Sequence, residues 1–251
     1  MHLGKQQALQ LLQQLDRHVS ASAKVEVVLC PSFTLLETLK PKLEPLKFKL
    51  GAQNLHYQDE GAFTGEISGS QLKDLAEYVI IGHSERRLQF SETDDIIARK
   101  VAAAVRNTIT PILCVGENLF ERQDNETARV IHDQLSSGLV MLTAKDVENI
   151  VIAYEPVWAV DSDNVATPEQ TKKAVQVIRN TIKELFGRQA EDKLRILYGG
   201  HMEPEFTQSY LNMKEVDGFL LGRASLNYHD FADIIKLSQS TLRPRRLTKA
   251  K

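Results

Sequence analysis

Short apolar runs alternate with longer amphipathic segments along almost the whole chain, and this alternation is the strongest constraint on its fold. The runs are continuous in apolar residues, which is typical of strands buried on both faces of a parallel sheet. No linker rich in Pro, Gly or Ser divides the series. We therefore predict one α/β domain with a parallel sheet. The predicted strands are residues 25–30, 48–52, 78–81, 111–115, 150–154, 194–198 and 218–221, and the predicted helices are residues 4–19, 34–43, 70–77, 93–107, 127–139, 167–186, 205–212 and 228–237.

The number of predicted strands separates two kinds of α/β fold. A closed (β/α)8 barrel has eight strands, each followed by a helix. This series has seven predicted strands and begins on a helix. It fits either an open sheet or a barrel whose first strand is missing from the sequence, and spacing alone leaves both possibilities open.

Composition bounds the class of protein. A chain of 251 residues, 42% of them hydrophobic, can bury the core of one such domain. A net charge of -2 gives no overall attraction to nucleic acid or to an anionic membrane surface, so neither is predicted as a partner. No signal peptide or long apolar span is present, and Cys30 and Cys114 lie far apart inside apolar runs. We therefore expect reduced core cysteines and a cytoplasmic location.

The basic residues gather at the end of the chain. Arg243, Arg245, Arg246, Lys249 and Lys251 have no acidic residue among them. We predict that residues 240–251 form a solvated, disordered tail, and that residues 1–239 form the α/β domain.

A carboxylate directly follows one of the predicted buried strands. Residues 150–154 are apolar, Glu155 comes next, and Pro156 stops the strand ladder. Barrel enzymes keep their chemistry at this end of their strands. After a polar segment, Thr167 and Pro168 start the next helix as N-cap and first-turn proline. The pattern suggests a catalytic base beneath a mobile loop, although a solvated loop glutamate would show the same local pattern.

A histidine occupies a similar place after an earlier strand. His83 follows residues 78–81 and precedes Ser84, a candidate N-cap. The positive end of a helix dipole disfavours an imidazolium, and a neutral imidazole can donate a hydrogen bond to a carbonyl oxygen that gains negative charge. By itself, a histidine in this position more often makes a structural hydrogen bond. Together with Glu155, it suggests proton abstraction next to a carbonyl group.

Glycines close the last two predicted strands, at Gly199-Gly200 and at Gly222, and residues 224–226 could begin a short helix. Loops in these positions commonly bind phosphate in barrel enzymes. A glycine-rich strand end is weak evidence by itself. Motifs of the GxxxxGK, HExxH, GxGxxG and CxxC types are absent from the sequence.

Five segments occur in an order and at separations that resemble the triosephosphate isomerase family: GHSERR, ILCVGE, AYEPVWA, YGG and DGFLLGRASL. The segment GAQNLHYQDEGAFTGEIS is similar to the family's dimer loop. The resemblance extends from Met1 to about Gln239. It implies a (β/α)8 barrel, interconversion of dihydroxyacetone phosphate and glyceraldehyde 3-phosphate through an enediol(ate), a homodimer, and no metal or organic cofactor.

The resemblance also implies roles for individual residues. Glu155 matches the family's base, and His83 matches its electrophile, a neutral histidine that polarises the carbonyl group. The other implied residues are Glu85 and Cys114 beside the catalytic pair; Pro156, Val157, Trp158, Val165, Ala166, Thr167 and Tyr198 in the lid; Asp161, His201, Gly222 and Arg223 at the phosphate; and Thr64, Glu66 and Arg86 at the dimer interface.

The sequence departs from the family pattern at two places. The family's first strand, which ends in Asn-x-Lys, has no counterpart, so we expect the barrel to lack that strand and its lysine. The phosphate loops differ as well, at residues 160–164, at His201 and at Arg223. An upstream start would explain the first departure, and a degenerate paralogue acting as a dimeric scaffold would explain the second. Because Glu155 and His83 are both retained, we favour the isomerase over the scaffold.

Overall fold

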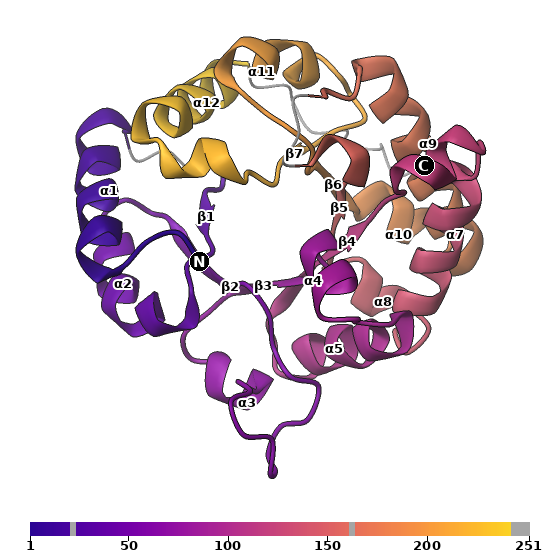
Figure 1. Cartoon of the computed structure of the whole chain (residues 1–251), viewed down its shortest axis with the longest axis horizontal. Helices are drawn as coiled ribbons and strands as arrows, with labels where there is room; N and C mark the ends of the chain where they lie inside the picture. Colours follow the sequence, from indigo (N-terminus) through magenta and orange to yellow (C-terminus); the bar gives the residue numbers. More distant parts are fainter. Residues whose placement is uncertain (21–23, 161–163, 242–251) are drawn as a thin grey trace.

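The computed structural model describes residues 1–20, 24–160 and 164–241. Parallel strands form an inner wall and helices surround it, as seen along the barrel axis in Figure 1. The strands within the described residues are β1 (Val28–Leu29), β2 (Lys49–Ala52), β3 (Tyr78–Ile81), β4 (Thr110–Val115), β5 (Val151–Tyr154), β6 (Arg195–Tyr198) and β7 (Gly218–Phe219). They pair in sequence order, β1 to β7, and every pair is parallel. The predicted fold class, a TIM barrel, is confirmed.

The outer helices alternate with the strands along the chain, singly or in groups, and α1 precedes β1. They are α1 (Lys5–His18), α2 (Leu36–Leu43), α3 (Gly69–Leu72), α4 (Ser84–Gln89), α5 (Asp94–Arg106), α6 (Leu119–Gln123), α7 (Thr127–Gly138), α8 (Ala144–Val147), α9 (Pro168–Phe186), α10 (Arg188–Lys193), α11 (Pro204–Leu211) and α12 (Tyr228–Ser240), with the 3-10 turns η1 (Phe33–Leu35), η2 (Val157–Ala159) and η3 (Arg223–Leu226). The longest, α9, begins with the predicted cap: Thr167 Oγ1 accepts the Gln170 N–H, and Pro168 is the first helical residue. Apart from its first two residues, the predicted basic tail lies outside the described residues.

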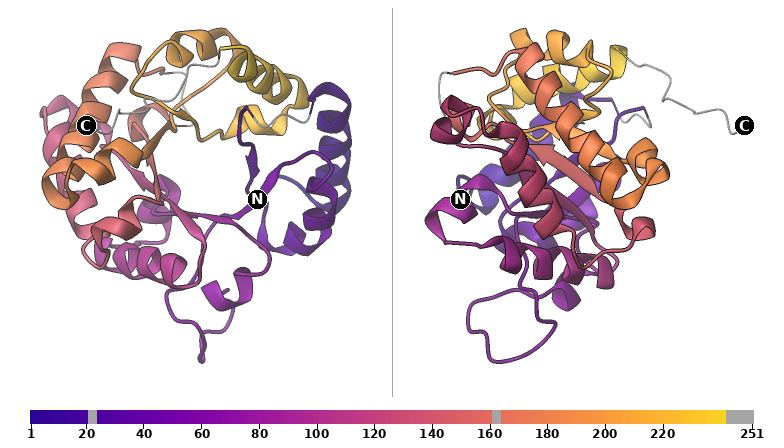
Figure 2. Two further views of the ribbon diagram at one scale, coloured as in Figure 1. Left: turned by 180° about the vertical axis from the view of Figure 1, so that it is seen from behind. Right: turned by 90° about the vertical axis from the view of Figure 1, so that its right-hand side faces the viewer.

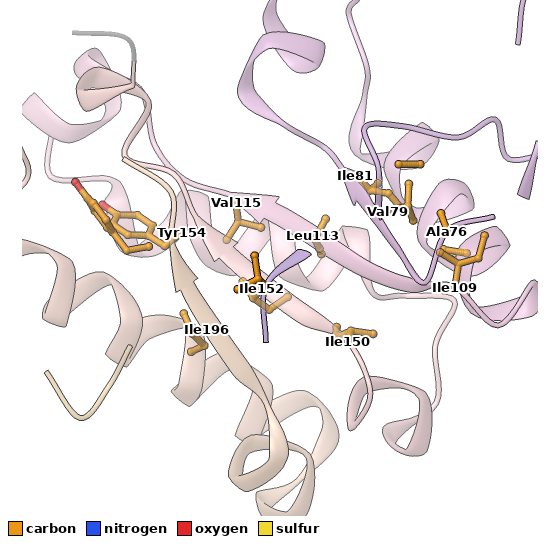
Figure 3. Close-up of a cluster of buried hydrophobic side chains, with 14 of the residues drawn as sticks. Ala76, Val79, Ile81, Ile109, Leu113, Val115, Ile150, Ile152, Tyr154 and Ile196 are labelled. Carbon is orange, nitrogen blue, oxygen red and sulfur yellow. The ribbon is translucent and has the colours of Figure 1, made fainter. Parts of the chain in front are cut away.

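The core lies between the strands and the helices. Figure 3 shows part of it, where Leu113, Ile152 and Ile196 from three neighbouring strands lie close together. All four residues of β5 are buried. Continuous apolar runs thus pack on both faces of these strands, which is why their sequence shows no polar alternation.

Two predicted strands and one predicted helix are shorter in the structure. The sequence predicts strands at residues 25–30 and 218–221, but only Val28–Leu29 and Gly218–Phe219 pair. These are the terminal strands of the sheet, and within the described residues no ladder joins them to each other. A strand with a partner on one side only forms fewer ladder bonds, which shortens it. The helix predicted at 70–77 is the single turn α3.

The segment between β2 and α3 projects away from the barrel, as both views in Figure 2 show. It contains the family-like dimer loop. His56 lies in its base, where its ring stacks on Tyr57 and contacts Phe63, with ring centroids 4.4 and 4.2 Å away. Arg106 and Asn107 hold the same segment through Asp59. The loop therefore has its own internal packing.

Candidate active site

The site is built where β3 to β6 end, because parallel strands bring their C-terminal ends to one edge of the barrel. Glu155 directly follows β5, and His83 comes two residues after β3. Gly116 allows the end of β4 to approach Glu155 closely, since a Cβ at this position would lie 1.8 Å from the Glu155 carbonyl oxygen. Gly82, with φ +72°, turns the chain from β3 into α4 in a conformation that glycine adopts readily.

Glu155 and His83 are in contact. His83 Nε2 lies 3.0 Å from Glu155 Oε1, and the other carboxylate oxygen, Oε2, accepts the Ser84 N–H at 2.9 Å. The Glu155 side chain is almost fully buried, and within the described residues its Oε1 has no hydrogen bond of normal geometry, although His83 Nε2 is near it. One carboxylate oxygen is therefore held in place, while the other has the capacity to take up a proton.

The hydrogen bonding of His83 defines its protonation state. Its Nδ1 accepts the Glu85 N–H at 3.3 Å, so the N-cap of α4 is His83 itself and not Ser84 as the sequence suggests. A ring nitrogen that accepts an N–H carries no proton, so the imidazole is neutral with its proton on Nε2. Nε2–H then faces the Glu155 carboxylate and the open end of the barrel, where it can donate to a developing oxyanion.

Cys114 and Glu85 flank this pair differently. Cys114 is fully buried, and burial, followed by the nearby Glu155 charge, raises the pKa of its thiol well above the usual value. The thiol is therefore protonated and adds no second charge beside Glu155. Glu85 is exposed at the rim of the site. The family resemblance places both residues beside the catalytic pair, and the structure brings them to the same strand ends.

A second buried carboxylate lies beside the site, and the sequence analysis assigns it no role. Glu117 has no exposed surface and accepts hydrogen bonds from Arg122, Tyr154 and Trp158, the last from Nε1 at 2.9 Å. Its backbone carbonyl accepts the Val157 N–H at 3.0 Å. The available signal is its place two residues past the end of β4, the same spacing that His83 has after β3. Glu117 fixes the chain that leaves Glu155.

The predicted lid residues lie on both sides of a short stretch outside the described residues, which includes Asp161. Pro156 is buried, Val157 and Trp158 form η2, and Ala166 is fully buried directly before the α9 cap. Val165 is half-buried, and Tyr198 is buried at the end of β6. His201 connects two of these regions, because its backbone N–H donates to the Ala159 carbonyl at 3.0 Å.

The remaining predicted phosphate residues share a cavity with the catalytic pair. This cavity has a volume of about 1870 Å³, and His201, Gly222 and Arg223 line it together with Glu155 and His83. Gly222 and Arg223 are exposed at the start of η3. The His201 ring lies 3.3 Å from Glu203 Oε1, measured from Nε2. The His201 N–H already donates to the Ala159 carbonyl, so a phosphate that it contacts shares this donor.

The predicted interface residues lie elsewhere. Thr64 and Glu66 are exposed on the projecting loop, whereas Arg86 Nε donates to Glu92 Oε1 at 2.6 Å within the chain. Among the described residues there is no group of three or more His, Cys, Asp or Glu side chains that could hold a metal ion. None of the described helices is both long enough and apolar enough to cross a membrane.

A parallel barrel with a buried carboxylate and a neutral imidazole in contact at its C-terminal strand ends belongs to the class of barrel enzymes equipped for proton transfer beside a carbonyl group. Comparison with known sequences narrows this class. The family model "Triosephosphate isomerase" matches residues 1–238, and the chain belongs to the triosephosphate isomerase family.

Individual relatives agree with the family match. The chain is 43% identical over 236 residues to the triosephosphate isomerase of Clostridium perfringens strain SM101. The aligned region covers 94% of this chain and 95% of the relative. The chain is 46% identical over 213 residues to that of Carboxydothermus hydrogenoformans, covering 84% and 85%. It is 41% identical over 236 residues to that of Clostridium tetani, covering 94% and 92%.

Proposed function

We propose that the chain interconverts dihydroxyacetone phosphate and D-glyceraldehyde 3-phosphate. Relatives that are 41–46% identical carry the name triosephosphate isomerase. The observation that carries the proposal is the contact between Glu155 Oε1 and His83 Nε2 at 3.0 Å, in a site where Oε1 has no hydrogen bond of normal geometry within the described residues. This pair can remove a proton next to a carbonyl group and stabilise the charge that results.

The reaction proceeds by proton transfer within the substrate. Glu155 leaves the Ser84 N–H, and its carboxylate takes a proton from the carbon next to the carbonyl group. The C–H electron pair forms the carbon–carbon double bond of an enediol(ate), and His83 Nε2–H donates to the oxygen that gains negative charge. The hydroxyl on the neighbouring carbon then passes its proton to that oxygen by way of His83 Nε2. Glu155 returns the carbon-bound proton to the neighbouring carbon, where the double-bond electron pair forms the new C–H bond, while the freed O–H electron pair forms the new C=O bond. One proton moves between the carbons and one between the oxygens with no change in the total number of electrons, so the isomerisation needs no cofactor.

The substrate phosphate is assigned to the loops around β6 and β7. Gly222 and Arg223 are exposed in the shared cavity, and His201 also lines it. We include Asp161, which lies outside the described residues. Arg223 brings a positive charge that can offset Asp161 near a dianion. Residues 156–158 and 165–167, with Tyr198, form the ends and the support of the lid.

We further propose a homodimer in the cytoplasm. The loop that contains Thr64 and Glu66 projects from the barrel, as an arm that reaches a second copy would, and Arg86 would meet Glu66 of that copy. The cysteines are both free, which supports a reducing compartment. The described residues offer no observation that favours a non-enzymatic scaffold over the enzyme.

The test is isomerase activity of the purified chain in deuterated water. We expect deuterium to enter the substrate carbon during turnover, and we expect this to stop in Glu155→Gln, which cannot accept the proton. A chain that binds 2-phosphoglycolate but neither turns over triose phosphate nor exchanges its hydrogen would contradict the proposal and favour the scaffold.

A further inference from the structure

Tyr210 is a fully buried residue of α11 that has no place in the proposed site. Its ring stacks on that of Tyr198, with centroids 4.4 Å apart and planes at 27°, and its edge meets Phe219 of β7. Offset aromatic pairs of this kind fix each other's orientation. Tyr210 is thus rigidly held against the ends of β6 and β7.

The Tyr210 hydroxyl donates a hydrogen bond to the backbone carbonyl of Ala166. Ala166 is itself fully buried and immediately precedes Thr167, the N-cap of α9. Burial raises the pKa of Tyr210, so its hydroxyl is a neutral donor. This side chain of α11 therefore determines where the peptide before α9 lies.

Two other buried hydroxyls lie close to this contact. The hydroxyls of Tyr198 and Thr171 lie beside Tyr210 and are also buried, but neither has a hydrogen-bond partner of normal geometry among the described residues. A Cβ at Gly200 would lie 2.3 Å from the Tyr198 hydroxyl, so there is little room beside it. The Tyr198 hydroxyl also interacts with the Ala166 backbone, and among these three hydroxyls that of Tyr210 donates to the Ala166 carbonyl.

Both ends of the stretch that follows Glu155 are attached to the same βα unit. At one end, the His201 N–H, just after β6, donates to the Ala159 carbonyl at 3.0 Å. At the other end, Tyr210 of α11 binds the Ala166 carbonyl. The β6–α11 unit therefore fixes the positions of Ala159 and Ala166 relative to each other and to the cavity.

We propose that Tyr210 is a positioning residue for the isomerisation, acting through the Ala166 peptide. The inference rests on the proposed function. By holding Ala166, Tyr210 keeps the peptide that leads into α9 in register with the phosphate residues of the cavity. Binding energy from a remote phosphate can then be used to orient the reacting carbons. Tyr210 itself does not contact the reacting atoms.

The test is Tyr210→Phe, which keeps the stacked ring and removes only the hydroxyl. We expect kcat/KM for the triose phosphates to fall about three- to tenfold, the effect of one neutral hydrogen bond on an equilibrium. D-glyceraldehyde has the reacting carbons but no phosphate, so its turnover should change less than about twofold. A general loss of folded protein would lower kcat/KM for both substrates by the same factor, so the ratio of the two kcat/KM values would not change.

A matched control lies at the other end of the barrel. Tyr78 is also buried, and its hydroxyl donates to Glu26 Oε1 at 2.6 Å. Tyr78→Phe should lower the thermal midpoint but leave the ratio between the two substrates unchanged. Equal losses for both substrates in Tyr210→Phe, or no loss for either, would overturn the positioning role. Absence of activity in the unsubstituted chain would instead contradict the proposed function.

Discussion

The two sides of the barrel differ in how firmly their strands are paired. On one side, β3, β4 and β5 are joined by four paired residues at each step, from Tyr78↔Thr110 to Val115↔Tyr154. On the other side, β1 and β7 contribute two residues each, are only half-buried, and are not joined by a ladder within the described residues. The cavity reaches both of these strands.

The two sides also carry different parts of the proposed site. Glu155 and His83 follow strands of the firmly paired side, whereas Gly222 and Arg223 follow β7. Proton transfer tolerates little displacement, because a shift of about 1 Å can cost 10²-fold in rate. Binding of an anion by loop amides and one cation tolerates larger displacements than proton transfer does. The comparison predicts that substitutions on the paired side affect the chemical step and stability, and that those beside β7 affect affinity.

The largest effect is expected for Glu155→Asp. Shortening the side chain by one methylene withdraws the carboxylate from the substrate carbon while its backbone stays next to the β5 ladder. We expect kcat to fall by about 10²-fold or more with a much smaller change in KM, measured by steady-state kinetics. An unchanged kcat would remove Glu155 from the role of base.

Gly116→Ala tests the close packing of the paired side directly. The new methyl group would lie 1.8 Å from the Glu155 carbonyl oxygen, so β4 and β5 would have to separate. We expect a loss of about 1–3 kcal/mol in the free energy of unfolding, together with reduced activity. Gly222→Ala is the matched control beside β7, where a Cβ meets no atom within 4 Å, and it should change stability by less than about 0.5 kcal/mol. If urea melts show similar losses in the free energy of unfolding for both variants, the two sides of the barrel do not differ in packing in this way.

Arg223→Gly tests the side near β7. If Arg223 binds the phosphate, its loss should weaken 2-phosphoglycolate binding about tenfold or more, because a charge-assisted contact is worth about 1.5–3 kcal/mol. Stability should hardly change, since Arg223 is exposed. Calorimetric titration gives the affinity. If the glycine variant binds as well as or better than the parent, Arg223 is not a phosphate ligand.

The smallest effect concerns the ionic cluster that joins the two sides at the other end of the barrel. Glu26, just before β1, accepts hydrogen bonds from Tyr78 of β3 and Arg195 of β6 and pairs with Lys49 of β2. Burial raises its pKa, but the hydrogen bonds from Tyr78, Lys49 and Arg195 outweigh it and lower the pKa from 4.5 to about 2. The contribution of ionised Glu26 to the stability of the fold is therefore fully present above about pH 4.5 and is lost as the pH falls toward 2.

Glu26→Gln should consequently cost about 1–2 kcal/mol at neutral pH, after allowance for solvent screening of a side chain that is about one-third exposed. The stability of the Glu26→Gln variant should depend less on pH between 4.5 and 2 than the stability of the parent protein does. Thermal melts over this pH range provide the measurement. Parallel pH profiles for the two proteins would show that Glu26 does not link the two sides.

The local pattern of apolar residues predicts the well-paired strands better than it predicts the terminal strands and the short helices. Continuous apolar runs predict strands at residues 78–81 and 150–154, and the structure has Tyr78–Ile81 and Val151–Tyr154. The sequence predicts the start of α4 near Ser84 but does not predict the short helices α6, α8 and α10, because four to six residues are too few to show a helical period. N-caps such as Asn118 and Thr143 are the signal that remains.

The sequence by itself determined the order of strands and helices, the single parallel sheet, and the placement of Glu155 and His83 at strand ends, because burial periodicity and the polarity of parallel strands are written in local pattern. Only the tertiary structure decided which atoms meet. It brought Glu155 Oε2 to the Ser84 N–H, buried Glu117 against Trp158, and joined Tyr210 to Ala166. These contacts connect residues from 41 to 71 positions apart, and they depend on barrel curvature and side-chain packing, which no short stretch of sequence specifies.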